Sequence, residues 1–190
     1  MTPRDCTAAA MPRSGTDSDR YLFGRILDIA AADAGRPLTA ALGLGRSDLA
    51  RLIAKHRPDR ESLLAALPAD AGLGEDAPEE SDLRALLLEH RAGAAEEEVW
   101  LAAIVARRSL EPNHLWQDMG FAGRDDLGAM FRRHFPSLVA LNSGDMKWKK
   151  FFYRQLCQRE GVLLCKSPHC ERCEDYAACF DGEKGAALVP

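Results

Sequence analysis

The residues best suited to chemistry in this chain are four cysteines that fall within fifteen positions near its C-terminal end. They are Cys165, Cys170, Cys173 and Cys179, separated by four, two and five residues. Thiolates are soft, strongly donating ligands, and several of them on one short loop can meet at one centre when a compact cluster of metal and sulfide lies between them. The spacing therefore predicts an iron–sulfur-type cluster site.

A single zinc ion and a pair of disulfides are the alternative uses of these thiols. Structural zinc sites usually combine two close Cys pairs with a spacer of roughly 12 to 20 residues, whereas this ligand set is continuous. Disulfides persist in oxidising compartments, and the N-terminal residues 1–20 lack the apolar core of a secretory signal. We therefore expect a cytoplasmic protein with reduced thiols, and a cluster in preference to zinc.

Three further side chains are candidate labile metal ligands, namely His169, His134 and Cys157. His169 is the best placed of them because it directly precedes Cys170 and follows Pro168, whose restricted backbone suits a tight loop. Cys157 falls on a predicted helix ahead of the cluster loop. The more ordinary role of a cysteine there is that of a small, buried apolar side chain. For the two histidines, a solvent contact or a hydrogen bond is the ordinary alternative.

The net charge of the chain is −4, and it is unevenly distributed. Residues 70–98 carry ten acidic residues against two arginines, whereas residues 124–154 carry seven basic residues against three acidic ones. A basic surface that leads into a thiolate cluster could attract an oxyanion or an acidic partner, although a solvated helix face is the ordinary alternative. The candidate residues for such binding are Lys147, Lys149, Lys150 and Arg154.

The spacing of apolar residues predicts an all-α protein. Leu22, Ile26 and Ile29 recur at three- and four-residue intervals, and the alternation of β-branched residues that is typical of strands is nearly absent. The helices are expected at about 18–34, 47–57, 60–67, 81–92, 95–109, 124–134 and 144–160.

Several helix ends are also predicted. Ser47 is the expected N-cap of the helix at about 47–57, and Ser143 or Asp145 that of the last helix. Gly35 and Gly161 suit the left-handed position that follows a helix.

The predicted organisation is a flexible tail over 1–17, a helical domain over 18–161, a Cys-rich metal-cluster loop over 162–182 and a second tail over 183–190. A Pro-, Gly- and acid-rich linker over 68–80 divides the helical domain.

The two halves of the helical domain resemble each other. Residues 38–58 match residues 115–136 when one residue is inserted in the turn, so that Gly43 lies over Gly120. This match predicts an internal helix-turn-helix-like pseudo-repeat, about 20–58 and 97–136, with a chance match between two Leu/Arg/Asp-rich helices as the alternative.

The block from Met146 to Phe180, with its four-two-five cysteine spacing, resembles the signature of the nitrogen-fixation protein family NifQ, and FRRHFPSLVALN before it is similar to that family as well. The resemblance is specific over about 115–182. It implies a protein that holds a molybdenum-containing iron–sulfur (Mo-Fe-S) cluster and supplies molybdenum for biosynthesis of the nitrogenase iron–molybdenum cofactor. The four cysteines then match the cluster-binding cysteines of the family.

The same resemblance implies the partners of the protein: molybdate, a NifEN-type cofactor scaffold and a NifH-type iron protein. It describes a metallochaperone and not an enzyme. No nucleophile with its base and no phosphate-binding glycine loop is recognisable in the sequence. Oxidised molybdenum is a hard metal that arrives as an oxyanion, so a sulfur cage beside a cationic surface is a reasonable carrier.

An iron–sulfur redox module or a nucleic-acid-binding module is the alternative function. DNA glycosylases also end in a helical domain with a four-cysteine iron–sulfur loop, although its usual spacing is six-two-five. The acidic net charge and the absence of a basic recognition helix in the first repeat argue against nucleic acid. No stretch approaches the ~18 apolar residues of a membrane span, so no membrane contact is expected.

Overall fold

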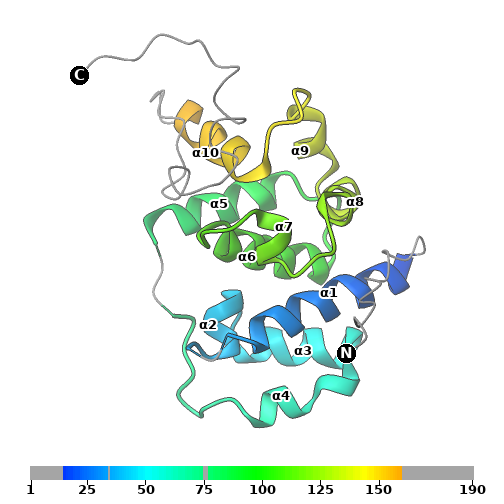
Figure 1. The fold of residues 1–190 in the computed structure, drawn as a ribbon, viewed down its shortest axis with the longest axis vertical. Coiled ribbons are helices and arrows are strands. Elements are labelled where there is room, and N and C mark those ends of the chain that lie inside the picture. The colour runs from blue at the N-terminus through cyan, green and yellow to red at the C-terminus, as the bar shows by residue number, and fades with distance from the viewer. Residues whose placement is uncertain (1–14, 34, 75–76, 160–190) are drawn as a thin grey trace, which may run out of the picture.

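The computed structural model describes residues 15–33, 35–74 and 77–159, and every regular element in these ranges is a helix (Figure 1). The all-α class is therefore confirmed for the described part of the chain. The elements are α1 Gly15–Ala31, α2 Leu38–Leu42, α3 Arg46–His56, the 3-10 turn η1 Pro58–Arg60, α4 Ser62–Ala65, α5 Pro78–Glu89, α6 Glu96–Ser109, α7 Leu115–Asp118, α8 Arg124–His134, α9 Pro136–Leu141 and α10 Trp148–Arg159.

Helix α6 is the centre of the fold because it is buried around nearly its whole circumference. Twelve of its fourteen residues are buried, including all seven from Trp100 to Ala106. A helix that is apolar on all sides is a core helix. It contacts α2, α3, α5 and α7, and in Figure 1 the layer of α5 to α7 lies between α1 to α4 below and α9 and α10 above.

Helix α10 docks onto this body through aromatic side chains. Phe151 and Phe152 are fully buried, and the ring of Trp148 stacks on that of Phe131 with centroids 3.8 Å apart. At the other end of the helix, Arg159 forms a two-bond ion pair with Glu89 of α5, at 2.6 and 3.1 Å. The helix that precedes the cysteine segment is therefore held at both ends.

Two predicted N-caps are wrong. Helix α3 begins at Arg46 with Gly45 as its N-cap, so Ser47 lies inside the helix. Helix α10 begins at Trp148 rather than near 144, because the Asn142 side chain closes a loop by accepting a hydrogen bond from Met146 N and donating one to Met146 O, both 2.9 Å long. Ser143 and Asp145 belong to this loop and do not cap α10.

Other helix boundaries differ as well. Helix α1 ends at Ala31, too early for Gly35 to occupy the position that closes it. Gly161 lies outside the described residues. The short helices α2, α7 and α9 were not predicted, since four to six residues are too few to show a helical period.

The two segments of the predicted repeat have similar local structures. Each consists of a short helix, a left-handed glycine and an eleven-residue helix, with φ of 62° at Gly43 and 72° at Gly120. Each turn is held by the helix that precedes the other segment: Arg107 of α6 donates to Ala40 O, and Arg25 of α1 donates to Gly120 O. These contacts fit a pseudo-twofold arrangement, and the repeat itself stays an interpretation of the sequence.

No helix in the described ranges has the length and apolar character needed to cross a bilayer.

Candidate functional site

The predicted metal ligands fall largely outside the described residues. All four cysteines and His169 lie beyond Arg159, the last residue that the structure describes. Within the described ranges, no three His, Cys, Asp or Glu side chains come close enough together to hold a metal ion. Cys157, near the end of α10, is half-buried. The site that the structure does describe therefore lies on the helical body that precedes the cysteine segment.

His134 has a structural role in the core of the protein. Its side chain is 6% exposed, and its Nε2 lies 3.0 Å from Asp19 Oδ1, a carboxylate that Arg133 also contacts at 3.1 Å. Nε2 cannot bind a metal without leaving this buried carboxylate uncompensated by the histidine. The candidate role of His134 as a labile ligand gains no support from this geometry.

The four basic candidates differ in their roles. Lys149 is 14% exposed, and its Nζ donates to Asp118 Oδ2 at 2.6 Å, to Asn113 O at 2.7 Å and to the carbonyl of Glu111. An ammonium group has three N–H donors, and these three acceptors tie the start of α10 to α7. Lys149 is therefore a structural bridge.

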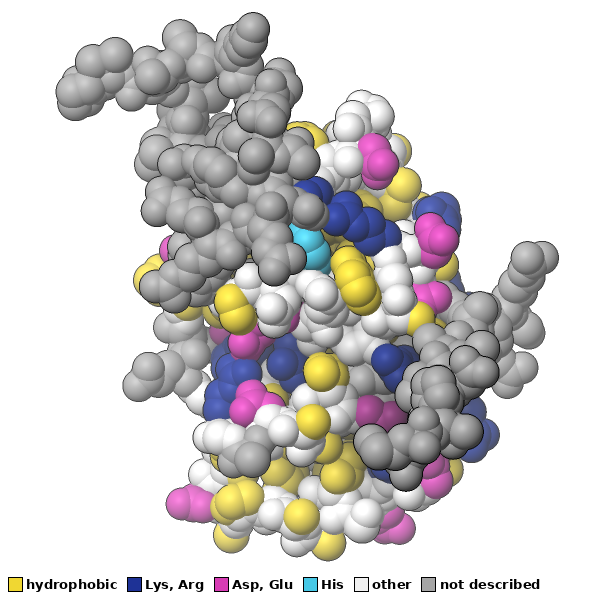
Figure 2. Space-filling model, viewed as in Figure 1, with side chains coloured by type: hydrophobic (Ala, Val, Ile, Leu, Met, Phe, Trp, Pro, Cys, Tyr) yellow, Lys and Arg dark blue, Asp and Glu magenta, His cyan; other side chains and the backbone are white. Residues whose placement is uncertain are grey.

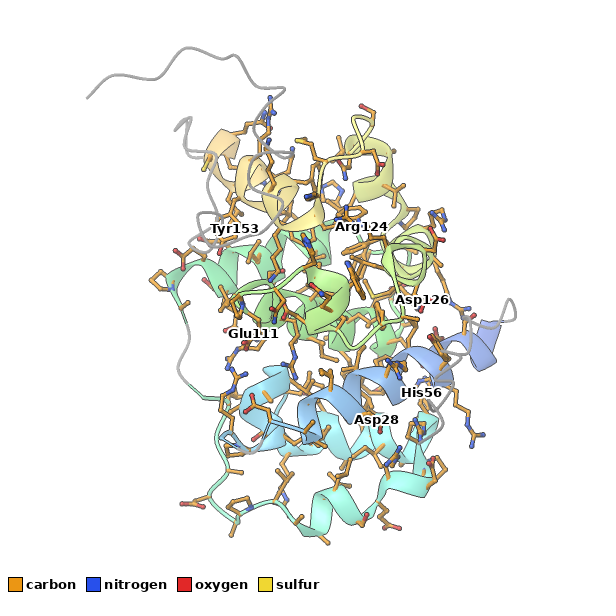
Figure 3. All side chains as sticks on the ribbon, viewed as in Figure 1. Asp28, His56, Glu111, Arg124, Asp126 and Tyr153 are labelled. Atoms are coloured by element: carbon orange, nitrogen blue, oxygen red, sulfur yellow. The ribbon has the colours of Figure 1, made fainter. Side chains whose placement is uncertain are left out.

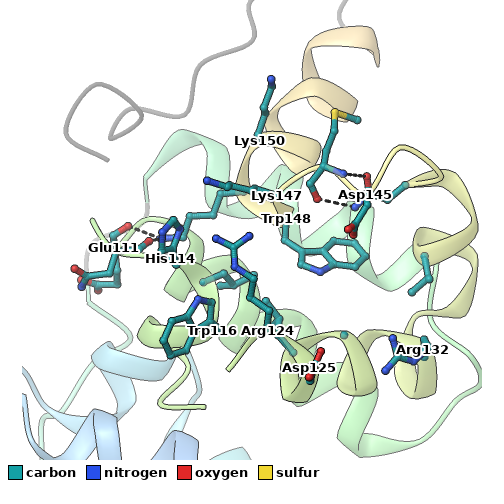
Figure 4. A pocket seen from close by; sticks show the side chains of 18 of the residues that line it. Glu111, His114, Trp116, Arg124, Asp125, Arg132, Asp145, Lys147, Trp148 and Lys150 are labelled. Atoms are coloured by element: carbon teal, nitrogen blue, oxygen red, sulfur yellow. Dashed lines mark hydrogen bonds between the residues drawn. The ribbon is translucent and has the colours of Figure 1, made fainter. Parts of the chain in front are cut away.

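Lys147, Lys150 and Arg154 lie around the same end of α10. Lys150 is buried to 6% exposure and lines the pocket described below. In Figure 4 the side chain of Lys147 points toward His114 and Arg124. Arg154 Nη1 lies 3.8 Å from Met146 Sδ, across the loop that leads into α10. Three of the four basic candidates, Lys147, Lys149 and Lys150, thus line the same pocket, and Arg154 is not among its lining residues.

A pocket of about 480 Å³ opens between the loop before α7, the first turn of α8 and the start of α10. Figure 3 shows two of its residues, Arg124 in the upper half of the molecule and Glu111 near its middle, both apart from His56 near α1 and α3. The lining residues are Glu111, Pro112, Asn113, His114, Leu115, Trp116, Arg124, Asp125, Leu127, Gly128, Arg132, Val139, Asn142, Asp145, Met146, Lys147, Trp148, Lys149 and Lys150.

The pocket has an excess of positive charge. Its lining contains five Lys and Arg residues and one histidine against three carboxylates, and Figure 2 shows a histidine and basic side chains gathered in the upper half of the same view. In Figure 4 the side chains of His114, Arg124 and Lys147 point toward one another. These residues come from three different elements, and such convergence of positive charge favours an anion.

Each of these three residues stands at the start of a helix. His114 is the N-cap of α7 and Arg124 is the first residue of α8. The carbonyl of Lys147 accepts the first-turn hydrogen bond of α10 from Phe151 N, at 2.9 Å. The N-terminal ends of α8 and α10, eleven and twelve residues long, therefore add their partial positive charge to that of the side chains.

Two indole rings form the apolar walls of the pocket. Trp148 is fixed by its stack on Phe131. Trp116 lies below His114 and Arg124 in Figure 4, and its Nε1 is covered from solvent with no hydrogen-bond acceptor among the described residues. Sequence reasoning did not identify His114, Trp116 or Arg124 as site residues, because no local pattern indicates that their elements meet.

Comparison with known protein families identifies one family that matches most of the chain. The NifQ family model matches residues 22–181, which include all four cysteines. The chain belongs to the NifQ family.

Three curated relatives illustrate the extent of the similarity. This NifQ-family chain is 44% identical to "Protein NifQ" of Rhodobacter capsulatus over 84% of its own length and 86% of the relative's. It is 40% identical to "Protein NifQ" of Azotobacter vinelandii over 75% and 78% of the two chains. It is 37% identical to "Protein NifQ homolog" of Sinorhizobium fredii over 92% and 76%. No solved structure matches this chain.

Proposed function

We propose that this NifQ-family protein is a molybdenum carrier for nitrogen fixation. It holds a Mo-Fe-S cluster on its C-terminal cysteines and supplies molybdenum for biosynthesis of the nitrogenase iron–molybdenum cofactor. Family membership supports the role in nitrogen fixation. The observation that carries the proposal further is that the four-cysteine segment follows directly on α10, whose first turn forms a wall of the basic pocket.

The chain offers separate chemistry for the two metals of such a cargo. Cysteine thiolates are suited to iron and sulfide, and Cys165, Cys170, Cys173 and Cys179 would hold the iron corners of the cluster. Oxidised molybdenum is hard and enters as an oxyanion, for which a cationic approach is favourable. Lys147 with its basic neighbours around the start of α10 provides that approach.

The anchoring of α10 limits how far the cysteines can lie from the helical body. Phe151 and Phe152 bury the first half of the helix, and the Arg159–Glu89 pair fixes its end. Cys165 follows six residues after Arg159, and six residues of chain span at most about 21 Å. Cys165 is thus tethered within about 21 Å of the end of α10, and the opposite end of the same helix forms a wall of the pocket.

A labile nitrogen ligand would let molybdenum leave while iron stays. His169 remains the candidate for this role, because it directly precedes Cys170. We expect His169→Ala to lower bound molybdenum while iron is retained. His134→Ala, by contrast, should lower the melting temperature by removing the buried contact with Asp19. Unchanged molybdenum content in His169→Ala would show that this histidine is not the labile ligand.

Release of the metal is then an exchange of ligands with an acceptor, and no catalytic turnover by the carrier is involved. We propose that the acceptors are a NifEN-type scaffold and a NifH-type iron protein, and that transfer takes place in the cytoplasm. Anaerobic mixing of the loaded carrier with each acceptor, followed by separation and metal analysis of both proteins, tests this step. Molybdenum that stays entirely on the carrier with both acceptors present would refute it.

The decisive experiment is metal analysis with low-temperature electron paramagnetic resonance, on protein purified without oxygen from molybdate-fed cells. A Cys170→Ala, Cys173→Ala variant is prepared in parallel. Iron and molybdenum in the parent protein, and neither in the variant, are the expected result. Iron without molybdenum would favour the alternative of an ordinary iron–sulfur module. Zinc alone would overturn the cluster assignment.

A further inference from the structure

The covered indole N–H of Trp116 is the feature of the pocket that the proposed function does not explain. An indole nitrogen is a donor only, and a covered donor without an acceptor is unfavourable. Trp116 Nε1 has no acceptor among the described residues, and in Figure 4 its ring lies directly below His114 and Arg124. An acceptor placed among these side chains would complete the site.

The charges around Trp116 indicate what kind of acceptor fits. Arg124 and Lys147 are cationic, and the starts of α8 and α10 add the positive ends of two helix dipoles. A guanidinium group presents a planar fork of donors that matches two oxygens of an oxyanion, and a lysine acts as a point charge beside it. An anion with several strong acceptor oxygens is therefore the matching ligand.

We propose that this pocket is an oxyanion site, in which a tetrahedral dianion is bound by Arg124, Lys147, His114 and the indole N–H of Trp116. Given the proposed function, on which the identity of the anion rests, the physiological ligand is molybdate. The site is distinct from the cysteines: it holds the incoming oxyanion before molybdenum is incorporated into the cluster. Lys149 is excluded from it, because its donors are directed to Asp118, Asn113 and Glu111.

The proposed site occupies only one part of the pocket. Arg132 contributes to the same lining, but in Figure 4 it lies on the far side of Trp148 from the other three side chains. If the whole basic surface bound anions by charge alone, Arg132 and Arg124 would contribute equally. If the anion is held by the donors around Trp116, Arg124 contributes to its affinity and Arg132 does not.

The test is equilibrium binding of molybdate to the full chain with all four cysteines replaced by serine, so that no cluster can form. We expect saturable binding that tungstate competes for. Arg124→Gln should weaken it at least tenfold. Trp116→Phe should weaken it several-fold, because phenylalanine keeps an aromatic wall at this position but has no N–H donor. Arg132→Gln is the matched control and should leave the affinity within about twofold. The melting temperature of each variant confirms that it is folded.

Three results would overturn the inference. One is the absence of molybdate binding to the cysteine-free chain. A second is equal weakening in Arg124→Gln and Arg132→Gln, which would indicate unspecific attraction. The third is binding that appears only after Glu171, Glu174 and Asp175 are neutralised, which would show that the acidic cysteine segment of the chain itself occupies the pocket.

The same experiment separates this inference from the proposed function. Binding to the cysteine-free chain does not depend on iron or on the cluster, so it can succeed when the parent protein contains no molybdenum–iron–sulfur centre. Conversely, the parent protein could contain molybdenum while the cysteine-free chain binds no molybdate. That result would support the proposed carrier function and refute the oxyanion site.

Discussion

Nε2 of His56 lies 2.8 Å from Oε1 of Glu97, with both side chains less than 10% exposed. The histidine ends α3, and the carboxylate stands in the first turn of α6. The same geometry recurs between His134, 78 positions after His56 and at the end of α8, and Asp19 near the start of α1, at 3.0 Å. Each pair joins one half of the molecule to the first helix of the other.

The buried carboxylate of Glu97, which Lys55 and His56 both contact, predicts an acid-sensitive fold. Burial raises the pKa of Glu97, but hydrogen bonds from Lys55, from its own backbone N–H and from His56 outweigh this effect and lower the pKa from 4.5 to about 2. Because the folded pKa lies below the unfolded one, the stabilisation is present above about pH 4.5 and is lost as the pH falls toward 2. A shift of this size corresponds to roughly 3 kcal/mol.

Urea unfolding at several pH values between 7 and 3 measures this contribution. The free energy of unfolding should fall with pH in the parent protein, and it should fall less steeply in Glu97→Gln, which cannot titrate. Parallel curves for the two proteins would show that Glu97 does not contribute to the acid sensitivity.

The left-handed turn at Gly120 predicts a strong intolerance of side chains. A Cβ atom on Gly120 would lie 2.6 Å from Arg25 O and 2.9 Å from Ile29 Cβ, in addition to the strain of φ +72°. Gly120→Ala should therefore lower the free energy of unfolding by about 2 kcal/mol or more. Gly123, three residues later, has an extended backbone with φ −175°, and a Cβ atom added there would meet nothing within 4 Å.

Gly123→Ala is thus the control for the same turn, and it should change stability by no more than about 0.5 kcal/mol. Thermal unfolding of the two variants makes the comparison. Similar melting temperatures for both would mean that the contact between α1 and the turn at Gly120 is not formed as described.

Neighbouring arginines on α6 should respond oppositely to substitution. Arg107 is 4% exposed and forms a 2.7 Å ion pair with Glu80, which is 1% exposed. Arg107→Met removes a cation from that buried carboxylate, and the expected cost is roughly 3–5 kcal/mol.

Arg108 is equally buried, but its Nε and Nη2 have no hydrogen-bond acceptor among the described residues, and burial lowers its pKa. Methionine keeps the packing of its aliphatic stem without the buried charge. Arg108→Met should therefore cost less than about 1 kcal/mol or increase stability. Denaturant unfolding of both variants tests this prediction. A larger decrease in the free energy of unfolding for Arg108→Met than for Arg107→Met would contradict it.

Removal of metal should leave the helical body intact. The hydrophobic core of the described residues runs from Leu22 to Phe152 and ends thirteen positions before the first of the four cysteines. After anaerobic chelation, we expect the far-ultraviolet circular dichroism and a cooperative thermal transition to persist. Loss of that transition together with the metal would show instead that the cluster is required for folding, as in small metal-organised domains.

Much of the fold was predictable from the sequence because it depends on residues that are near one another in the chain. The apolar spacing around Leu22 and Ile26 indicates α1, which the structure confirms. The cluster that the cysteine spacing predicts lies outside the described residues and stays a prediction. The start of α10 was not predictable in this way, because the Asn142 loop is favoured by two hydrogen bonds that compete with helix initiation at Ser143 or Asp145.

The composition and spacing of the chain by themselves determined a helical protein with four closely spaced cysteines near its C-terminal end and a basic stretch before them. Only the tertiary structure decided which basic residues face a common space. Lys149 and Lys147 are two positions apart. Lys149 donates hydrogen bonds to the loop before α7 and to Asp118 of α7, whereas the side chain of Lys147 points toward Arg124 and His114 in the pocket. The reason is physical: helical periodicity and ligand spacing act between chain neighbours, whereas a pocket depends on how separate helices pack against one core.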